Sequence, residues 1–244
     1  LSTRRQRQMC IRDRSSSTIN MRLISVSRYY DYLVSVGVRD DNPCKYLRVK
    51  RGVLKVRSNL LSREVLEGLY SSFSSKEVFH HPLGRISHER NKVLLSLMIY
   101  QGASSGDLAR LCVSDVSLEA GKVYFRGSVR RSSRRLLLES SQVLLLKDYL
   151  DVYRMLLGPL GDELIPGNVV RLVSYLFECL RGDYGYVENA LQLRGSVIRY
   201  WLSCYHKREV QYMAGHKQLS STEHYDVGSL DNLGVSLDKH HPLC

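Results

Sequence analysis

The 244-residue chain lacks the features that would place it in a membrane or in an oxidising compartment. Its apolar runs are all shorter than the roughly 18 residues that a membrane span needs. No apolar stretch follows the basic N-terminus, which argues against a signal peptide. Its six scattered cysteines include no C-x-x-C pair, which argues against a zinc knuckle and a disulfide framework and favours reduced thiols in a cytosol. We find no long-period repeat, and no low-complexity tract beyond short serine runs.

Metal-ligand patterns are equally sparse. The pairs His80-His81 and His240-His241 lack a third ligand at a suitable spacing, so we expect no metal and no cofactor. What the chain does carry is positive charge, with a formal net charge of +12 and a sequence pI of about 9.5. This excess favours a nucleic-acid partner, because Lys and Arg contacts to phosphates release counterions. Anionic membranes attract the same charge, but the chain has no basic amphipathic helix suited to them.

Residues 1–14 differ in character from the rest of the chain. The string Met9-Cys-Ile-Arg-Asp13, followed by Arg14, back-translates to a sequence that resembles the transposon-end adapter of sequencing libraries. We therefore interpret 1–14 as a non-native, adapter-derived segment, and expect the native reading frame to enter near Ser15 from a longer N-terminus. Without this segment the chain still carries a net charge of +8.

Hydrophobic periodicity divides the remainder into two helical parts joined by a basic linker. Helical spacing over 18–36 and the turn signal Asp41-Asn-Pro43 predict a partial helical domain over 15–44. The segment 45–59 is rich in Lys and Arg and is expected to be extended. It either lies along a DNA backbone or serves only as a soluble tether. The residues 60–244 are expected to form the second domain.

The second domain is predicted to be mainly α-helical, with one small antiparallel β-sheet. Strands at 121–125 and 134–138 flank a turn at 127–133 and form a hairpin. A short helix is expected after Gly102. The apolar spacing predicts longer helices over 62–69, 87–100, 141–156, 169–180, 187–205, 207–213 and 220–226.

Three residues near the C-terminus suggest chemistry on a phosphodiester. Arg194, His216 and Tyr225 are predicted to lie on successive short helices of a basic protein. Tyrosine can supply a nucleophile. Arginine grips phosphate through two parallel hydrogen bonds, and histidine can donate a hydrogen bond or move a proton.

In their order and spacing, these residues resemble the tyrosine recombinase (phage-integrase) family from Ser15 to the end of the chain. Residues 100–108 are similar to the first motif, G-L-R-x-x-E-L, and 191–194 match the second motif, H-x-L-R. Residues 214–216 match the L-G-H box, and Tyr225 falls at the spacing of the nucleophile. By this resemblance, 15–44 is a truncated core-binding domain and 60–244 the catalytic domain. Residues 208–216 and 241–243 are similar to a subgroup from Bacteroidetes mobile elements.

The catalytic set is incomplete by the family's pattern. Ser104 stands at the first arginine position, and Leu191 stands at the histidine of the second motif. No lysine lies between Lys122 and Lys147, where the family has a lysine-bearing hairpin. Five arginines lie on this hairpin instead, and we hypothesise that one of them replaces part of the missing charge. The alternative is a solvated basic hairpin that contacts the DNA backbone.

The resemblance also implies roles for single residues. Tyr225 would attack the scissile phosphate and form a 3′-phosphotyrosine, which conserves the bond energy without metal or ATP. Arg194 and His216 would stabilise charge on the phosphate oxygens, and Asp107 would orient its neighbours. The residues expected to contact DNA are Arg130, Arg131, Arg134, Lys50, Arg51 and Lys217.

The function implied by the resemblance is that of a site-specific recombinase or integrase that cuts and rejoins double-stranded DNA. Recombinases act as multimers, so we expect self-association on DNA, in a bacterial cytoplasm at the nucleoid. The alternative is a catalytically weak or inactive DNA-binding relative with an architectural or regulatory role, which Ser104 and Leu191 favour. A third reading is a topoisomerase-like enzyme that relaxes supercoils without a specific site.

Overall fold

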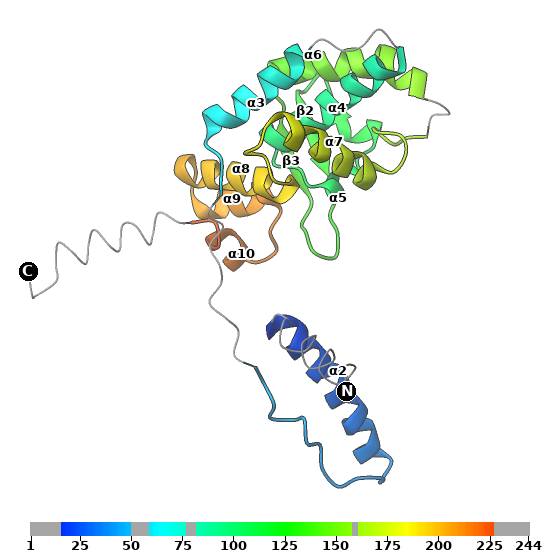
Figure 1. Cartoon of the computed structure of the whole chain (residues 1–244), viewed down its shortest axis with the longest axis vertical. Coiled ribbons are helices and arrows are strands. Elements are labelled where there is room, and N and C mark those ends of the chain that lie inside the picture. The colour runs from blue at the N-terminus through cyan, green and yellow to red at the C-terminus, as the bar shows by residue number, and fades with distance from the viewer. Residues whose placement is uncertain (1–15, 50–58, 77–81, 158–160, 227–244) are drawn as a thin grey trace, which may run out of the picture. The chain divides into compact units, whose positions relative to one another are not determined.

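The computed structural model describes residues 16–49, 59–76, 82–157 and 161–226, which belong to two compact units. The first unit covers 1–55 and the second covers 56–244, so their boundary falls within the linker predicted at 45–59. Figure 1 shows the elements of both units. No helix among the described residues is long and apolar enough to cross a membrane.

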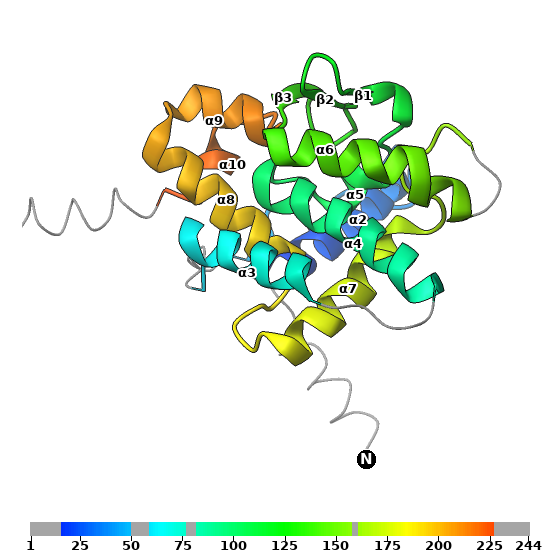
Figure 2. The same cartoon turned by 90° about the horizontal axis from the view of Figure 1, so that it is seen from above.

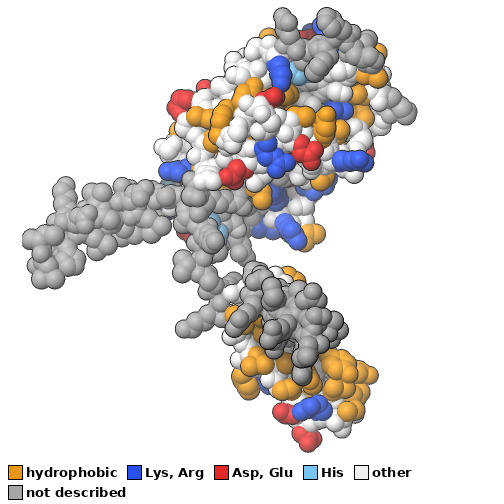
Figure 3. All heavy atoms as spheres, in the orientation of Figure 1, with side chains coloured by type: hydrophobic (Ala, Val, Ile, Leu, Met, Phe, Trp, Pro, Cys, Tyr) orange, Lys and Arg blue, Asp and Glu red, His pale blue; other side chains and the backbone are white. Residues whose placement is uncertain are grey.

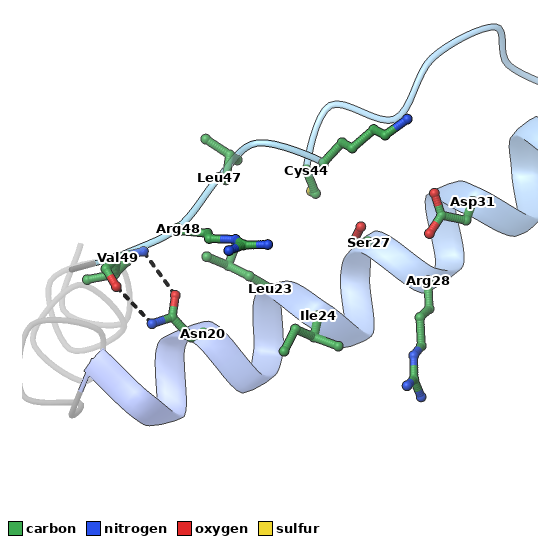
Figure 4. Close-up of a pocket in the computed structure, with 11 residues that line it drawn as sticks. Asn20, Leu23, Ile24, Ser27, Arg28, Asp31, Cys44, Leu47, Arg48 and Val49 are labelled. Atoms are coloured by element: carbon green, nitrogen blue, oxygen red, sulfur yellow. Dashed lines mark hydrogen bonds between the residues drawn. The ribbon is translucent and has the colours of Figure 1, made fainter. Parts of the chain in front are cut away.

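The described part of the first unit consists of helix α2 (Ser16–Ser35) and a chain segment that runs back along it. Asn20 pairs with the backbone of Val49 through two hydrogen bonds, of 2.8 and 2.9 Å (Figure 4). The Asn42 amide donates to the carboxylate of Asp31 at 2.6 Å. Hydrophobic side chains cover much of the surface of this unit (Figure 3), and none of its described residues is fully buried. The described part therefore has no core of its own.

The second unit is mainly helical, as predicted. Its α-helices are α3 (Arg63–Ser75), α4 (Pro82–Tyr100), α5 (Ser105–Leu108), α6 (Ser140–Asp148), α7 (Val169–Asp183), α8 (Ala190–Cys204), α9 (Lys207–Ala214) and α10 (Ser220–Glu223). A 3₁₀ turn, η1 (Val113–Asp115), precedes the sheet, and η2 (Tyr149–Tyr153) and η3 (Arg154–Leu157) follow α6.

The sheet is antiparallel and has three strands, in the order β1 (Val116–Ser117), β2 (Lys122–Phe125) and β3 (Arg134–Leu137). The predicted hairpin is confirmed, with Lys122 opposite Leu137 and Phe125 opposite Arg134. The short strand β1 was not predicted, because two residues are too few to show an alternating pattern.

Helix α4 forms the centre of the core. Val93, Leu94 and Leu97 are fully buried. The helix packs against α3, α6 and α8 (Figure 2), and also against η2. On α8 the apolar stripe of Val197, Ile198 and Trp201 is buried too, as expected for core packing. This core fixes α8, and α8 carries the arginine of the predicted site.

Several element boundaries differ from the prediction. Helix α4 begins at Pro82 rather than near residue 87, and α8 begins only at Ala190, where Asn189 caps it. The helix predicted over 141–156 changes after Asp148 into a π-helical turn and then a 3₁₀ turn. Helix α10 ends at Glu223, so Tyr225 lies just beyond it.

Candidate active site

The site is built around Asp107, in the short helix α5. Ser104 caps this helix: its hydroxyl accepts from the Asp107 N–H at 3.2 Å, and the Asp107 carboxylate accepts from the Ser104 N–H at 3.1 Å. A serine three residues before an acidic residue is a typical helix-start pattern. The capping box fixes the carboxylate of Asp107, which is fully buried.

Arginine side chains surround this carboxylate. Nη1 of Arg131 lies 2.5 Å from its Oδ2, Nη2 of Arg134 lies 3.0 Å from the same atom, and Nη1 of Arg194 lies 4.0 Å away. Burial opposes ionisation of Asp107, but the charges of Arg134 and Arg131 outweigh it and lower its pKa. On the other side, Nη2 of Arg110 lies 3.3 Å from Oδ1 of Asp107. Four guanidinium groups among the described residues thus share one carboxylate, which leaves the site with a surplus of positive charge.

Arg194 comes from α8 and is 3% exposed. Its Nη1 donates to the carbonyl of Gly102, and its Nη2 donates to the carbonyl of Ala214. Burial, together with the charges of Arg131 and Arg134, lowers its pKa to about 9. The group still carries its proton at neutral pH, but its surroundings disfavour the charge. A bound anion would relieve this effect.

His216 is placed by the turn that ends α9. Gly215 closes the helix at φ +67°, and a Cβ there would lie 2.8 Å from Nη1 of Arg134. Both the backbone conformation and the space therefore require glycine. The next residue, His216, forms an antiparallel bridge with Arg131 of the hairpin. This bridge joins the hairpin turn to the histidine.

The imidazole of His216 has one close polar partner, with its Nδ1 2.9 Å from Oγ1 of Thr222. Thr222 is fully buried in α10. Burial, followed by the charges of Arg194, Arg131 and Arg134, lowers the pKa of His216 to about 4. The ring is therefore neutral at physiological pH, and a neutral imidazole offers one hydrogen-bond donor and one acceptor.

Tyr225 lies beside His216 and packs against α8, the helix that carries Arg194. Its ring is nearly parallel to that of His216, at 13°, with 6.1 Å between the ring centroids. It also packs on Gly195 of α8, where a Cβ would stand 3.3 Å from Cε1 of Tyr225. The negative charge of an ionised Tyr225 would raise the pKa of Arg194, which also indicates proximity. Figure 1 shows α8, α9 and α10 grouped at one end of the unit.

The structure thus brings together Arg194, His216 and Tyr225, which the sequence analysis had grouped, and places Asp107 beside them. Ser104 belongs to the same cluster, because its hydroxyl accepts a hydrogen bond from Nη1 of Arg131. Leu191 lies one turn before Arg194 on α8 and is 54% exposed.

The residues expected to contact DNA are divided by the structure. Arg130 and Lys217 are exposed, Arg131 turns inward to Asp107, and Lys50 and Arg51 lie outside the described residues. For Arg134 the prediction was wrong. This side chain is buried beneath the hairpin, pairs with Asp107 and stacks on Phe125, with its Cζ 4.6 Å from the ring centroid. Its role is therefore that of a buried ion-pair partner of Asp107.

Sequence reasoning missed Gly195 and Thr222. Gly195 had a weak signal, since a glycine inside a helix is unfavourable by about 1 kcal/mol and needs a reason. Thr222 had none, because only the return of α10 onto α9 brings its hydroxyl to His216.

Comparisons with known proteins find tyrosine recombinases among the relatives of this chain. Tyrosine recombinase XerC of Lactobacillus delbrueckii subsp. bulgaricus is 25% identical over 240 residues, which cover 93% of this chain and 78% of the relative. Tyrosine recombinase XerC of Serratia marcescens is 27% identical over 235 residues, covering 93% and 74%. No family model matches the chain.

Solved structures share the fold. The XerA recombinase superposes with a TM-score of 0.57 at 19% identity, covering 90% of this chain and 83% of that one. The Tn1549 transposon integrase in complex with transposon right end DNA gives a TM-score of 0.67 at 12% identity, covering 96% and 82%.

The mainly helical fold with its three-stranded sheet is shared with these recombinase and integrase structures. In sequence and in fold, the chain resembles the tyrosine recombinase family.

Proposed function

We propose that this chain is a site-specific recombinase that cuts and rejoins DNA through a 3′-phosphotyrosine. The main support is the convergence of Arg194, His216 and Tyr225 in one cluster within one chain. The curated relatives bear the name tyrosine recombinase. Among the structural neighbours, one integrase is in complex with transposon DNA, and the XerH recombinase is bound to its difH substrate.

The charge balance of the site supports a phosphate substrate. Four guanidinium groups, those of Arg110, Arg131, Arg134 and Arg194, carry positive charge against the one negative charge of Asp107. The pKa of Arg194 is lowered to about 9 and that of His216 to about 4, in both cases first by burial and then by the neighbouring arginines. A phosphodiester brings the negative charge that would compensate this surplus.

In the proposed step, the phenol oxygen of Tyr225 bonds to phosphorus and the bond from phosphorus to the 5′ oxygen breaks. The phenol loses a proton and the departing 5′ hydroxyl gains one, so nothing else is consumed. Arg194 holds a non-bridging oxygen, and neutral His216 donates a hydrogen bond to it. The reverse reaction, with the 5′ hydroxyl of another strand, rejoins the DNA and frees the tyrosine.

Arg131 is the candidate to replace the family's first arginine, whose position is occupied by Ser104 in this chain. Of the five hairpin arginines, it is the one whose Nη1 donates to the hydroxyl of Ser104 itself. The same atom lies 2.5 Å from Oδ2 of Asp107, which fixes its position, and 23% of the side chain is exposed. Arg131 can therefore reach a phosphate at the position from which the family's first arginine would act.

Two exposed cations are proposed to grip the DNA backbone next to this site. Arg131 and His216 are paired in an antiparallel bridge. The next pair of positions along this bridge is Arg130, which precedes Arg131, and Lys217, which follows His216. Both are exposed, and like charges that face each other across a strand pair repel until an anion lies between them. Lys50 and Arg51 remain candidates for the same role in the linker.

The partner that follows from this function is double-stranded DNA, on which the chain would self-associate, in the cytoplasm near the nucleoid. Strand exchange joins two duplexes, and one active site cuts one strand. Sedimentation of the chain with and without a target duplex would test this assembly. A complex of one chain per duplex under all conditions would argue against it.

A nicked suicide duplex tests the proposed chemistry. Cleavage next to the nick releases a short fragment that diffuses away, so the covalent adduct accumulates. We expect an adduct with the wild-type chain and none with Tyr225→Phe, while Tyr205→Phe, an exposed tyrosine outside the site, should react normally. An adduct that persists in Tyr225→Phe would refute the assignment of the nucleophile.

The same assay addresses the second candidate function, a DNA-binding relative with little catalysis. Ser104 and the exposed Leu191 favour it, because both stand where the family has catalytic side chains. Normal DNA binding without any adduct would support this function over the recombinase.

A further inference from the structure

The nucleophile's ring lies on a glycine. Gly195 is buried in the middle of α8, directly after Arg194. A Cβ at this position would lie 3.3 Å from Cε1 and 3.7 Å from Cδ1 of Tyr225, and 2.9 Å from Cδ2 of Leu60. Its φ is not positive, so the backbone does not require glycine here. The space above α8 is therefore the reason for this residue, despite its low helix propensity.

The contrast with Gly68 of α3 supports this view. A Cβ on Gly68 would meet nothing within 4 Å. Both glycines lie in helices, but only Gly195 has side chains closed over it. Alanine at Gly195 would force Leu60 or Tyr225 to move, whereas alanine at Gly68 would only raise helix propensity.

The chain holds both neighbours in place above Gly195. The segment that carries Leu60 is tied to α8, because the Leu61 N–H donates to Oγ of Ser196 at 2.8 Å and Gln192 donates to the Asn59 carbonyl at 2.8 Å. This segment has little freedom to withdraw. A new side chain at Gly195 would therefore act on the tyrosine ring as well as on Leu60.

Tyr225 is fixed from both sides along the chain. Three residues before it, the buried Thr222 pairs with His216 at 2.9 Å. One residue after it, the Asp226 carboxylate lies 2.6 Å from Nζ of Lys207, at the start of α9. The tyrosine thus sits between two anchors, over Gly195 and beside the ring of His216.

From this geometry we propose that Gly195 is a positioning residue for strand cleavage. Because Gly195 has no side chain, the Tyr225 ring can lie directly on α8 beside Arg194. We call this contact surface at Gly195 the seat. It holds the nucleophile in place before DNA binds. The Lys207–Asp226 ion pair holds the residue after Tyr225 against the start of α9. This inference rests on the proposed function, because it assigns the seat to a nucleophile.

A small displacement of the ring should slow the reaction strongly. Attack on phosphorus needs the phenol oxygen at a defined distance and direction, and a shift of about 1 Å can slow a reaction by about 100-fold. The clash at 3.3 Å with a fixed neighbour requires a shift of a few tenths of an ångström. We therefore expect Gly195→Ala to slow cleavage by about 10-fold.

The test compares Gly195→Ala with Gly68→Ala in single-turnover cleavage of a nicked suicide duplex at saturating protein. Gly195→Ala should cleave about 10-fold more slowly, with DNA affinity and melting temperature close to those of the wild type. Gly68→Ala should cleave normally. Adding Leu60→Ala to Gly195→Ala should not restore the rate. Equal rates for the two alanine variants would overturn the proposal, and so would recovery with Leu60→Ala.

A second measurement keeps the seat separate from the proposed chemistry. In protein labelled with 3-fluorotyrosine, the ¹⁹F resonance of Tyr225 can be assigned by its loss in Tyr225→Phe. Without DNA, this resonance should shift in Gly195→Ala and stay unchanged in Gly68→Ala. If the wild type forms no adduct but the resonance shifts, the seat stands and the recombinase function falls. If the wild type cleaves and the resonance does not shift, the seat falls alone.

Discussion

Removal of Arg131 is the sharpest test of the charge arrangement in this site. Its Nη1 contacts the hydroxyl of Ser104 and lies 2.5 Å from Oδ2 of Asp107, at the position where the family carries an arginine on the first motif. Arg131→Ala removes this guanidinium and leaves the other partners of Asp107, namely Arg134 and Arg110, in place. The variant should therefore fold.

The expected loss of activity follows from the role of the side chain. Removal of one aligned donor to a developing oxyanion slows a reaction by about 100- to 1000-fold, so Arg131→Ala should lower the cleavage rate by at least this range. The free energy of unfolding should fall by less than on removal of Asp107 itself, because Asp107 keeps Arg134 and Arg110 as partners. The pKa values of Arg194 and His216 should rise, since the charge of Arg131 lowers both.

The assay is single-turnover adduct formation on the nicked duplex, with Arg130→Ala as the matched control. Arg130 is adjacent in sequence but exposed, so its loss should weaken DNA binding without changing the rate at saturation. Ser104→Arg, introduced into Arg131→Ala, should recover part of the rate. Cleavage by Arg131→Ala at the wild-type rate would refute the replacement argument, and the missing arginine of the first motif would then have no substitute among the hairpin residues.

Three further predictions follow from the same contacts. Asp107→Asn should lower the free energy of unfolding by about 3 to 5 kcal/mol in urea titrations, because buried guanidinium groups lose their counter-charge. The contribution of Asp107 to the free energy of unfolding is present above its unfolded pKa and should be lost as the pH falls below about 4. If Asp107→Asn lost stability in acid in the same way as the wild type, this reasoning would be contradicted. The folded pKa of His216 is lowered to about 4, so the wild type should lose stability as the pH falls from about 6.5 to about 4. His216→Gln should lose less stability over the same pH range. If stability fell equally with pH in both proteins, a buried neutral imidazole would be excluded. Arg130→Ala with Lys217→Ala should reduce the slope of log affinity against log salt by about 1.8, while an unchanged slope would exclude both from phosphate contacts.

Much of the fold could be predicted from the sequence. The helices predicted over 62–69 and 207–213 and the hairpin follow from local patterns and were confirmed. The break after Asp148 could not be predicted, because the apolar spacing continues through a π-helical turn and the tertiary packing of η2 on α4 determines the local geometry. Strand β1 was too short to give a pattern.

The sequence predicts candidate residues for the site, but it does not predict the electrostatics around them. Motif order identified Arg194, His216, Tyr225 and Asp107, and the charge count of the hairpin indicated that an arginine could replace the one missing at Ser104. The sequence gives no means of telling Arg131, which turns inward, from Arg130, which is exposed. It also placed Arg134 on the DNA surface, although the alternation of β3 puts this side chain on the buried face.

The sequence by itself determined the helical class and the basic character and singled out the candidate site residues, because periodicity, charge and motif spacing are local properties. Only the tertiary structure decided which guanidinium groups share Asp107, why His216 is neutral and where the ring of Tyr225 lies. These properties depend on distances and burial between segments up to about a hundred residues apart, such as Gly102 and Arg194. Such distances exist only once the core around α4 has packed.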